Sequence, residues 1–319
     1  MSVIAEGYPT PNMVVAVFKY LKQKKRTNPD ALHNMLSPIE LIKSEDGKRK
    51  SLEEDQDDEI SQNKSKDIHW MIKLTLNECK SMGLLVQTIS GIEINPLLVN
   101  KNEADIPSVI CDLFFSRIKN VDGENQVWDE KENHDFLRVC SWYLAQNCQD
   151  APANWKEAEK LLNEQFGNYK LGMNSVRYPQ FEYWFCYLGF GWRHSVKGTK
   201  RVTVPDPTLY LKRNLEVLFE SRKELPIIEF MDKLAKHSPV FEFGSFRNEI
   251  EPKIGGRDPN QLSSVTAMAL FRLQEEGFIK LSKESDADVL IFPDGKKDDQ
   301  DSIISHITLL AGIQICLEP

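Results

Sequence analysis

Apolar residues recur at helical spacing in several stretches of the chain, and polar segments separate these stretches. In the N-terminal third, steps of three and four residues predict amphipathic helices, with a further short helix opening at Pro29. Alternating residues around Ser90 and Gly91 predict a β-hairpin after the last of these helices. The predicted ranges are 11–21 and 67–82 for the longer helices, and 84–89 and 91–94 for the strands.

Three helices followed by a two-stranded hairpin is the element order of a winged helix, so residues 1–104 are expected to form such a domain. Within it, residues 43–66 are almost entirely polar and include a dense run of acids. No hydrophobic core absorbs such a run, so we expect an exposed, mobile insertion there.

The same order recurs near the C-terminus. Helices are predicted over residues 225–237 and 263–276, and strands over 278–281 and 289–292. The string SSVTAMALFRLQEEGFIKL looks like the recognition helix and first wing strand of winged-helix regulators. Residues 222–319 are therefore expected to form a second winged helix, in which the type of the apolar segment 303–317 is left open.

Residues 105–221 are expected to form a helical middle domain. Its helices are predicted over 107–118, 135–146, 155–165 and 180–188. Aromatic residues are dense between positions 181 and 192; a packed core is the favoured explanation and base stacking the alternative. The predicted fold is thus mainly α with small β wings, with two winged-helix domains flanking a helical middle domain.

Composition narrows the class of protein. The 319 residues exceed one typical core, and a net charge of -8 argues against a protein that coats nucleic acid indiscriminately. No stretch approaches the roughly 18 to 20 apolar residues of a membrane span, and residues 1–10 lack an export signal, so a cytoplasmic location is expected. The six cysteines include no Cys-x-x-Cys pair and are expected to be buried, reduced thiols.

Motifs that carry catalysis are absent from the sequence. It contains no phosphate-binding Gly-x-x-x-x-Gly-Lys-Ser/Thr run, no Gly-x-Ser-x-Gly elbow and no His-Glu-x-x-His helix. Acid pairs such as Asp286 and Asp288 lie in polar sequence and are best explained as solvated. Asp206, in the string VPDPT, is expected to cap a turn and a helix, with a catalytic role as the minor alternative. We therefore predict no catalytic residue, metal or cofactor.

Outward-facing residues of the N-terminal domain suit contact with DNA. On the predicted third helix these combine hydrogen-bond donors and cations, and the first helix adds a strip of five cations without an acid. A solvated surface explains such a strip equally well. The predicted DNA-binding residues are Lys19, Lys22, Lys24, Lys25, Arg26, Trp70, Lys73, Asn77 and Lys80.

The outward face of the C-terminal recognition helix is poorer in cations and richer in apolar surface. We expect it to contact a protein partner or the middle domain instead of DNA. The residues predicted to face outward are Ser264, Ala267, Met268, Phe271 and Glu275, with Arg272 at the flank.

Four strings between residues 179 and 288 resemble, in order, the DpdG proteins: FEYWFCYLGFGW, VPDPTLYL, LPIIEFMDKLAKHSPVF and IKLSKESDAD. These are accessory proteins of bacterial gene clusters for 7-deazaguanine DNA modification and phage restriction. The resemblance implies a role in a multi-component system acting on DNA, with the chemistry in other subunits. It carries over no catalytic residue, and it leaves the N-terminal domain to be interpreted from its own residues.

The leading hypothesis is a non-catalytic, DNA-associated adaptor whose partners are double-stranded DNA and other subunits of a DNA modification and restriction system. Three alternatives stay open. They are a protein-binding scaffold without DNA contact, a winged-helix transcription regulator, and a nuclease built from dispersed acids of the middle domain.

Overall fold

The computed structural model describes residues 9–28, 31, 57–119, 134–194, 202–293 and 302–310, and helices dominate this part of the chain. Its paired strands form small antiparallel sheets. The mainly helical class predicted from the sequence is therefore confirmed. The chain clusters into two compact units, Val3–Leu113 and Phe114–Pro319, hereafter unit 1 and unit 2. The division into three domains stays a prediction.

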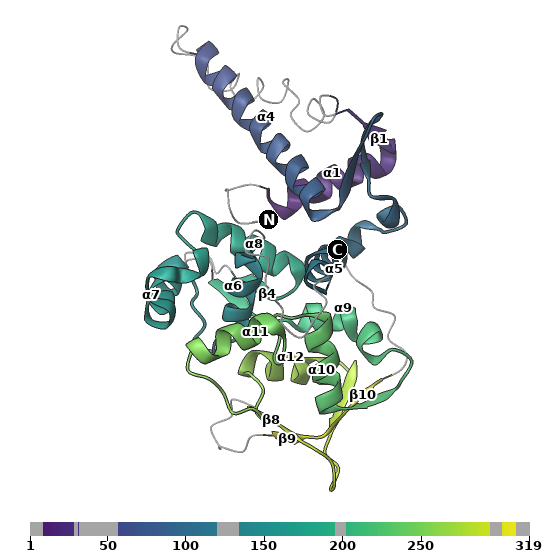
Figure 1. Ribbon diagram of the computed structural model, residues 1–319, viewed down its shortest axis with the longest axis vertical. Helices are drawn as coiled ribbons and strands as arrows, with labels where there is room; N and C mark the ends of the chain where they lie inside the picture. Colours follow the sequence, from purple (N-terminus) through teal and green to yellow (C-terminus); the bar gives the residue numbers. More distant parts are fainter. Residues whose placement is uncertain are drawn as a thin grey trace. The chain divides into compact units, whose positions relative to one another are not determined.

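Unit 1 runs from a helix and a short strand to a long helix and a hairpin (Figure 1). Its elements are α1 (Pro11–Lys24), β1 (Arg26–Thr27), α4 (Asp57–Met82), β2 (Leu85–Thr88), β3 (Gly91–Ile94), the 3-10 turns η1 (Pro96–Leu98) and η2 (Glu103–Asp105), and the start of α5 (Ile106–Lys119). The predicted hairpin around Ser90 and Gly91 is confirmed.

Local chemistry sets the ends of these helices. Pro11 lies in the first turn of α1, where its missing N–H leaves no helical hydrogen bond unmade. Gly83 adopts a positive φ of 83°, and the amides of Gly83 and Leu84 donate back to the carbonyls of Lys80 and Cys79. This left-handed cap ends α4 and turns the chain into the hairpin.

The core of unit 1 lies where α1 packs against α4. α1 buries Val14, Val17, Phe18 and Leu21, and α4 buries Ile72, Thr75, Leu76, Cys79 and Met82. These positions have the helical spacing from which the two helices were predicted. The apolar stripe of each helix is therefore also the face that packs against the other helix.

In the first sheet, β3 lies between β1 and β2, which gives the strand order first, third, second. Gly91 permits this arrangement. It has a φ of 136°, and a Cβ atom there would lie 2.5 Å from the carbonyl oxygen of Thr27 in β1. Only glycine combines that backbone conformation with so close an approach.

The predicted insertion needs a correction. Because α4 begins at Asp57, residues 57–66 belong to a helix and not to an irregular insertion. Glu, Lys, Gln and Ser are compatible with a helix whatever their polarity, so composition alone misled the prediction. Residues 43–56 lie outside the described residues, as does the helix predicted at Pro29, apart from Ala31.

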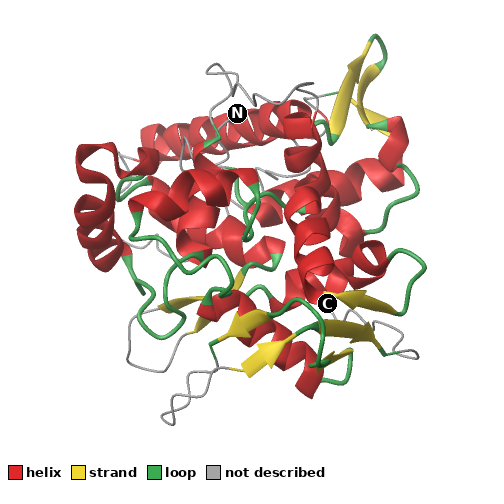
Figure 2. Ribbon diagram, turned by 60° about the horizontal axis from the view of Figure 1, so that its bottom comes forward, coloured by secondary structure: helices red, strands yellow, loops and turns green. Residues whose placement is uncertain are grey.

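Unit 2 contains many more helical residues than strand residues. Figure 2 shows the helices of the described chain in red and its small sheets in yellow. Its elements are α6 (Asp135–Leu144), α7 (Trp155–Phe166), η3 (Gly167–Gly172), α8 (Arg177–Leu188), β4 (Gly191–His194), β5 (Val202–Pro205), α9 (Thr208–Phe219), β6 (Glu224–Pro226), α10 (Ile227–His237), α11 (Ser245–Ile250), η4 (Glu251–Lys253), α12 (Ser264–Glu275), β7 (Ile279–Ser282), β8 (Leu290–Phe292), β9 (Ser302–Ile304) and β10 (His306–Leu309).

Aromatic side chains fill the centre of unit 2. Tyr143 and Phe185 meet edge to face at 5.1 Å, and Phe190 lies 4.7 Å from Tyr210. Burial raises the pKa of Tyr143 well above its ordinary value, and its hydroxyl lies 2.8 Å from the carbonyl oxygens of Pro152 and Thr203. Most of the aromatic run at 181–192 is therefore core, as expected.

The second three-stranded sheet has the order β6, β10, β7, again first, third, second among its own strands. β7 pairs with β10, whereas β8 pairs with β9. The predicted hairpin between residues 278–281 and 289–292 was therefore wrong, because the return strand lies beyond an inserted pair. Part of the segment left open at 303–317 forms β9 and β10, and residues 311–317 lie outside the described residues.

Candidate nucleic-acid and partner interfaces

The outward side of α4 carries the residues predicted to contact DNA. Trp70 is 49% exposed, and Lys73 and Asn77 are also exposed, so these three form an open stripe along the helix. Lys80 continues the stripe; it is half-buried, and its ammonium donates to Gln87 Oε1 of β2 at 3.0 Å. The structure thus brings four of the predicted residues to one side of α4.

The cationic strip on α1 is divided. Lys19 forms an ion pair with Glu103 at 2.6 Å, and Lys22 donates to Asn102 Oδ1 at 3.1 Å and to the carbonyl of Lys101. Lys24 and Lys25 are exposed. The side chain of Arg26 lies outside the described residues. A lysine that already pairs with another group of the protein, as Lys19 and Lys22 do, contributes less to binding phosphate. Lys24 and Lys25 are therefore the stronger candidates on this strip.

A network of hydrogen bonds stiffens the tip of the β2–β3 hairpin. The hydroxyls of Thr88 and Ser90 donate to Glu93 Oε1 at 3.0 and 3.1 Å, and Gln87 Nε2 donates to the carbonyl of Gly91 at 3.2 Å. Since Gln87 also accepts from Lys80, the hairpin is tied to the exposed side of α4. The stripe and the hairpin form one surface.

Five of the six residues predicted on the outward side of α12 line a hollow of about 800 Å³ within unit 2, together with residues 147–149 and Pro293. Met268 and Arg272 are partly exposed there. Ser264 accepts a hydrogen bond from the amide of Cys148 at 3.0 Å, and Phe271 packs against Phe292 at 5.6 Å.

One residue predicted to face outward from α12 does not. Ala267 is fully buried, in a helix that packs against both α9 and β7. The prediction assumed that only one face of α12 is buried. Because α12 packs against more than one element, it exposes a narrower face.

Asp206 takes the structural role expected of it. Its Oδ1 accepts from the amide of Thr208 at 3.2 Å and from the Thr208 hydroxyl, at the start of α9. The other oxygen pairs with Arg272 of α12. The carboxylate therefore fixes where α9 begins and joins it to α12.

Glu242 and Arg247 form a buried ion pair that sequence reasoning missed. Their side chains are 0% and 1% exposed and lie 3.4 Å apart. Glu242 also accepts from the amide of Ser263 at 2.9 Å and from Thr266 at 2.8 Å, at the first turn of α12. Burial opposes its charged form, yet Arg247, Arg257 and the Ser263 hydrogen bond hold the pKa of Glu242 below its ordinary value.

The cysteines are placed largely as expected. Cys79, Cys111 and Cys140 are buried, whereas Cys148 and Cys186 are half-buried and Cys316 lies outside the described residues. Burial raises the pKa of Cys186 to about 11 and that of Cys79 further, which keeps both as unreactive thiols at neutral pH. Among the residues that the structure describes, no group of three or more His, Cys, Asp or Glu side chains gathers as a metal site would require.

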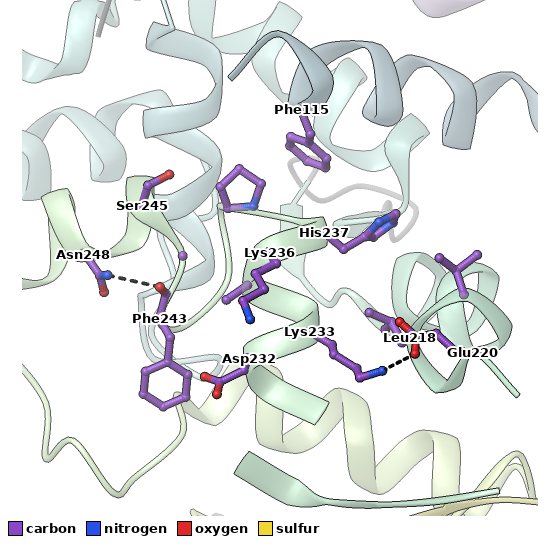
Figure 3. A pocket seen from close by; sticks show the side chains of 14 residues that line it. Phe115, Leu218, Glu220, Asp232, Lys233, Lys236, His237, Phe243, Ser245 and Asn248 are labelled. Carbon is purple, nitrogen blue, oxygen red and sulfur yellow. Dashed lines mark hydrogen bonds and ion pairs between the residues drawn. The ribbon is translucent and has the colours of Figure 1, made fainter. Parts of the chain in front are cut away.

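A second hollow in unit 2, of about 740 Å³, lies beside α10 and the start of α11 (Figure 3). Lys233 reaches across its edge to Glu220 at 2.7 Å, and Asn248 donates to the carbonyl of Phe243 at 3.1 Å. Its lining contains both cations and acids, so the charge of the lining favours no particular ligand. The same described part of the chain contains no helix that is both long and apolar enough to cross a bilayer.

The fold and these surfaces define a mainly helical protein of two compact units, each with a three-stranded antiparallel sheet next to a helix that offers an exposed side. A family model described as DpdG-like matches residues 1–287, so the chain belongs to the DpdG-like family. The match extends well beyond residues 179–288, where the resemblance was seen, and includes all of unit 1. Membership indicates a role in the Dpd 7-deazaguanine modification cluster, in association with its other proteins. Comparison with curated proteins and with solved structures gave no match.

Proposed function

We propose that each unit contains a winged helix. The support is topological: in both sheets the first strand pairs with the third, and a helix runs directly into the second strand. In unit 1 these are β1, α4, β2 and β3. In unit 2 they are β6, α12, β7 and β10, with α9 as the preceding helix. The second module then begins near Thr208, earlier than the boundary predicted at residue 222.

The chain acts, in this proposal, as a DNA-associated adaptor of a 7-deazaguanine DNA modification and restriction system. Unit 1 supplies the DNA contact. The observation that carries this is the exposed stripe of Trp70, Lys73 and Asn77 on α4, opposite the buried stripe, with the stiffened hairpin tied beside it. A helix of this kind places cations and amides against phosphates and base edges.

The second module has a different role. The start of α12 is held by the amide of Cys148, and its exposed side is hollowed and poor in cations, since Arg272 is already paired with Asp206, which offers DNA little. Met268 and the hollow around it suit a side chain of a protein partner. This observation favours binding to another protein of the cluster through unit 2.

The chain itself is not an enzyme in this proposal. Asp206, the acid weighed as catalytic, has both carboxylate oxygens committed to Thr208 and Arg272, where they cap α9 and join it to α12. Nicking of supercoiled DNA in the presence of magnesium or manganese, lost on Asp206→Ala, would contradict this part of the proposal.

The test of DNA contact is fluorescence anisotropy with a labelled duplex over a range of salt concentrations. The variant combines Lys24→Glu, Lys25→Glu and Lys73→Glu, all at exposed lysines of unit 1. Wild-type affinity should fall steeply with salt, and the variant should lose most of it. Each lysine that contacts a phosphate should lower the salt slope by about 1.

A matched control makes the same change of charge in unit 2, at the exposed lysines Lys156, Lys160 and Lys283. It should bind the duplex almost as wild type does. Equal loss in both triple variants would show a response to net charge alone, and unchanged binding in the unit 1 variant would remove α4 and the α1 strip as the interface.

The partner contact is tested by co-expression with the other cluster proteins. Met268→Lys should abolish co-purification of the subunit bound at α12, whereas Val217→Lys, at an exposed apolar residue of α9, should preserve it. Retention in both variants would contradict binding at α12.

A further inference from the structure

The ribbon formed by β4 and β5 has two faces of different character. Its strands pair in the register Trp192 with Val204, Arg193 with Thr203, and His194 with Val202. Directly paired residues share a face, so Arg193 and Thr203 point one way and Trp192, His194 and the two valines point the other.

The inner face is fixed to the unit by polar contacts. Glu182 of α8 accepts from Thr203 at 2.6 Å and pairs with Arg193 at 3.3 Å. The guanidinium of Arg193 also lies over the ring of Tyr183, 4.4 Å from its centre. These contacts hold the ribbon in one orientation against α8.

The outer face presents an aromatic platform. Trp192 is 42% exposed, although most of the aromatic residues around it in sequence are core. The His194 ring stands against the Trp192 ring at 5.8 Å, and His194 is exposed as well. The indole of Trp192 is held by the neighbouring ring and by a strand whose other face is bound to α8. Its flat apolar surface therefore loses little conformational entropy when a ligand binds.

The sequence that joins the two strands of this ribbon is rich in cations, in contrast to the chain as a whole. Residues 183–205 contain no Asp or Glu, and three cations besides the inward-facing Arg193 occur there, Lys197, Lys200 and Arg201, in a chain whose net charge is -8. An exposed aromatic ring in a locally cationic, acid-free sequence is the combination that unpaired bases and their phosphates require.

We infer that the outer face of the β4–β5 ribbon binds single-stranded DNA, with an unpaired base stacked on Trp192 and His194 beside it. We infer DNA and not RNA as the ligand because the family belongs to a DNA-modification system. The site lies in unit 2 and does not depend on the duplex contact proposed for α4.

The experiment measures binding of the full chain to a labelled single strand of about 16 nucleotides. Trp192→Ala should weaken binding about tenfold, the loss of one base–aromatic stack. Trp192→Phe should retain most of the affinity. Trp192→Leu should behave like Ala, because leucine preserves the apolar surface but lacks a flat ring.

Two controls separate stacking from other causes. Phe243→Ala removes another exposed aromatic of unit 2 and should leave single-strand affinity unchanged. Single-strand DNA should also quench tryptophan fluorescence in the wild type, and the quenching should shrink in Trp192→Phe. Since Trp192 is partly exposed, circular dichroism of its variants should match wild type.

Several results would overturn the inference: wild-type affinity in Trp192→Ala, full affinity in Trp192→Leu, or tighter binding of an RNA strand of the same length. If Trp192→Leu loses a co-purifying cluster protein and keeps its DNA affinity, the ribbon is a protein-docking face and the inference is wrong. The triple lysine variant of unit 1 should keep single-strand affinity, so failure of the duplex proposal and failure of this one are distinguishable.

Discussion

Glu242 shows how a single residue organises unit 2. Its carboxylate lies among Arg247, Ser263 and Thr266, and it joins the turn before α11 to the first turn of α12. A negative charge at that position also favours the positive end of the α12 dipole. The orientation of α12, and with it the candidate partner face, therefore depends on one buried carboxylate and the hydrogen bonds that it accepts.

Replacing Glu242 by Gln should lower the free energy of unfolding of unit 2 by about 2 kcal/mol, because the buried Arg247 would lose one of its two carboxylate partners and keep only Glu251, at 2.8 Å. Urea unfolding followed by circular dichroism measures the loss. The control is Glu164→Gln, which removes a carboxylate from the exposed pair with Lys160 and should change the midpoint very little. A similar midpoint for both variants would contradict the role given to Glu242.

The same pair predicts a pH dependence. The pKa of Glu242 is lowered in the folded chain, whereas an unfolded Glu titrates near about 4.3. The unfolded chain then binds the proton more readily, so the stabilisation is complete above about pH 4.3 and is lost as pH falls through the lower folded pKa. The difference in stability between wild type and Glu242→Gln should narrow in that acid range. A difference independent of pH would show that Glu242 is not charged when folded.

Residues whose role is local were the ones predicted correctly. Gly83 ends α4 and Asp206 caps α9, because turn and cap chemistry needs only neighbours in sequence. Glu242 was missed because its partners are recruited from other elements. The one signal was an acid set between Phe241 and Phe243, since a charge inside an apolar run needs a buried partner.

At the scale of elements, helices were easier to predict than strand pairs. α1, α6, α7 and α12 lie within a few residues of their predicted ranges, because each is amphipathic along its own length. The pairing of β7 with β10 was not predictable from local alternation, since β8 and β9 intervene in sequence and are equally apolar. Strand pairing is decided by tertiary packing.

Gly91 tests whether the first sheet depends on one close approach. Gly91→Ala should destabilise unit 1 by at least about 2 kcal/mol, from the positive φ and from contact of the new Cβ with the Thr27 carbonyl in β1. Gly255 has a similar φ of 110° but open space around it, so Gly255→Ala isolates the cost of backbone strain alone. Equal losses in the two variants, measured in urea, would mean that the approach of β1 matters little.

At the scale of the whole molecule, the repeated strand order suggests one module used twice with different surroundings. In unit 1 the helix that leads into the hairpin keeps an exposed stripe of Trp70, Lys73 and Asn77. In unit 2 the corresponding α12 is enclosed by α9 and residues 147–149. The two winged helices and their different outward chemistry stay predictions of the sequence. The packing of α12 against α9 was not predictable, because it depends on contacts between distant segments.

Because each unit has its own core, unfolding should proceed in two steps, and the variants above should act separately. Hydrogen–deuterium exchange in increasing urea, followed peptide by peptide, assigns each step to its residues. Gly91→Ala should advance exchange in α1, α4 and the β2–β3 hairpin only, and Glu242→Gln should advance it in α6, α11 and α12 only. If either variant accelerates exchange equally throughout both units, the two units unfold as one cooperative body. Partner binding at α12 would then affect a DNA contact in unit 1 through the stability that the units share.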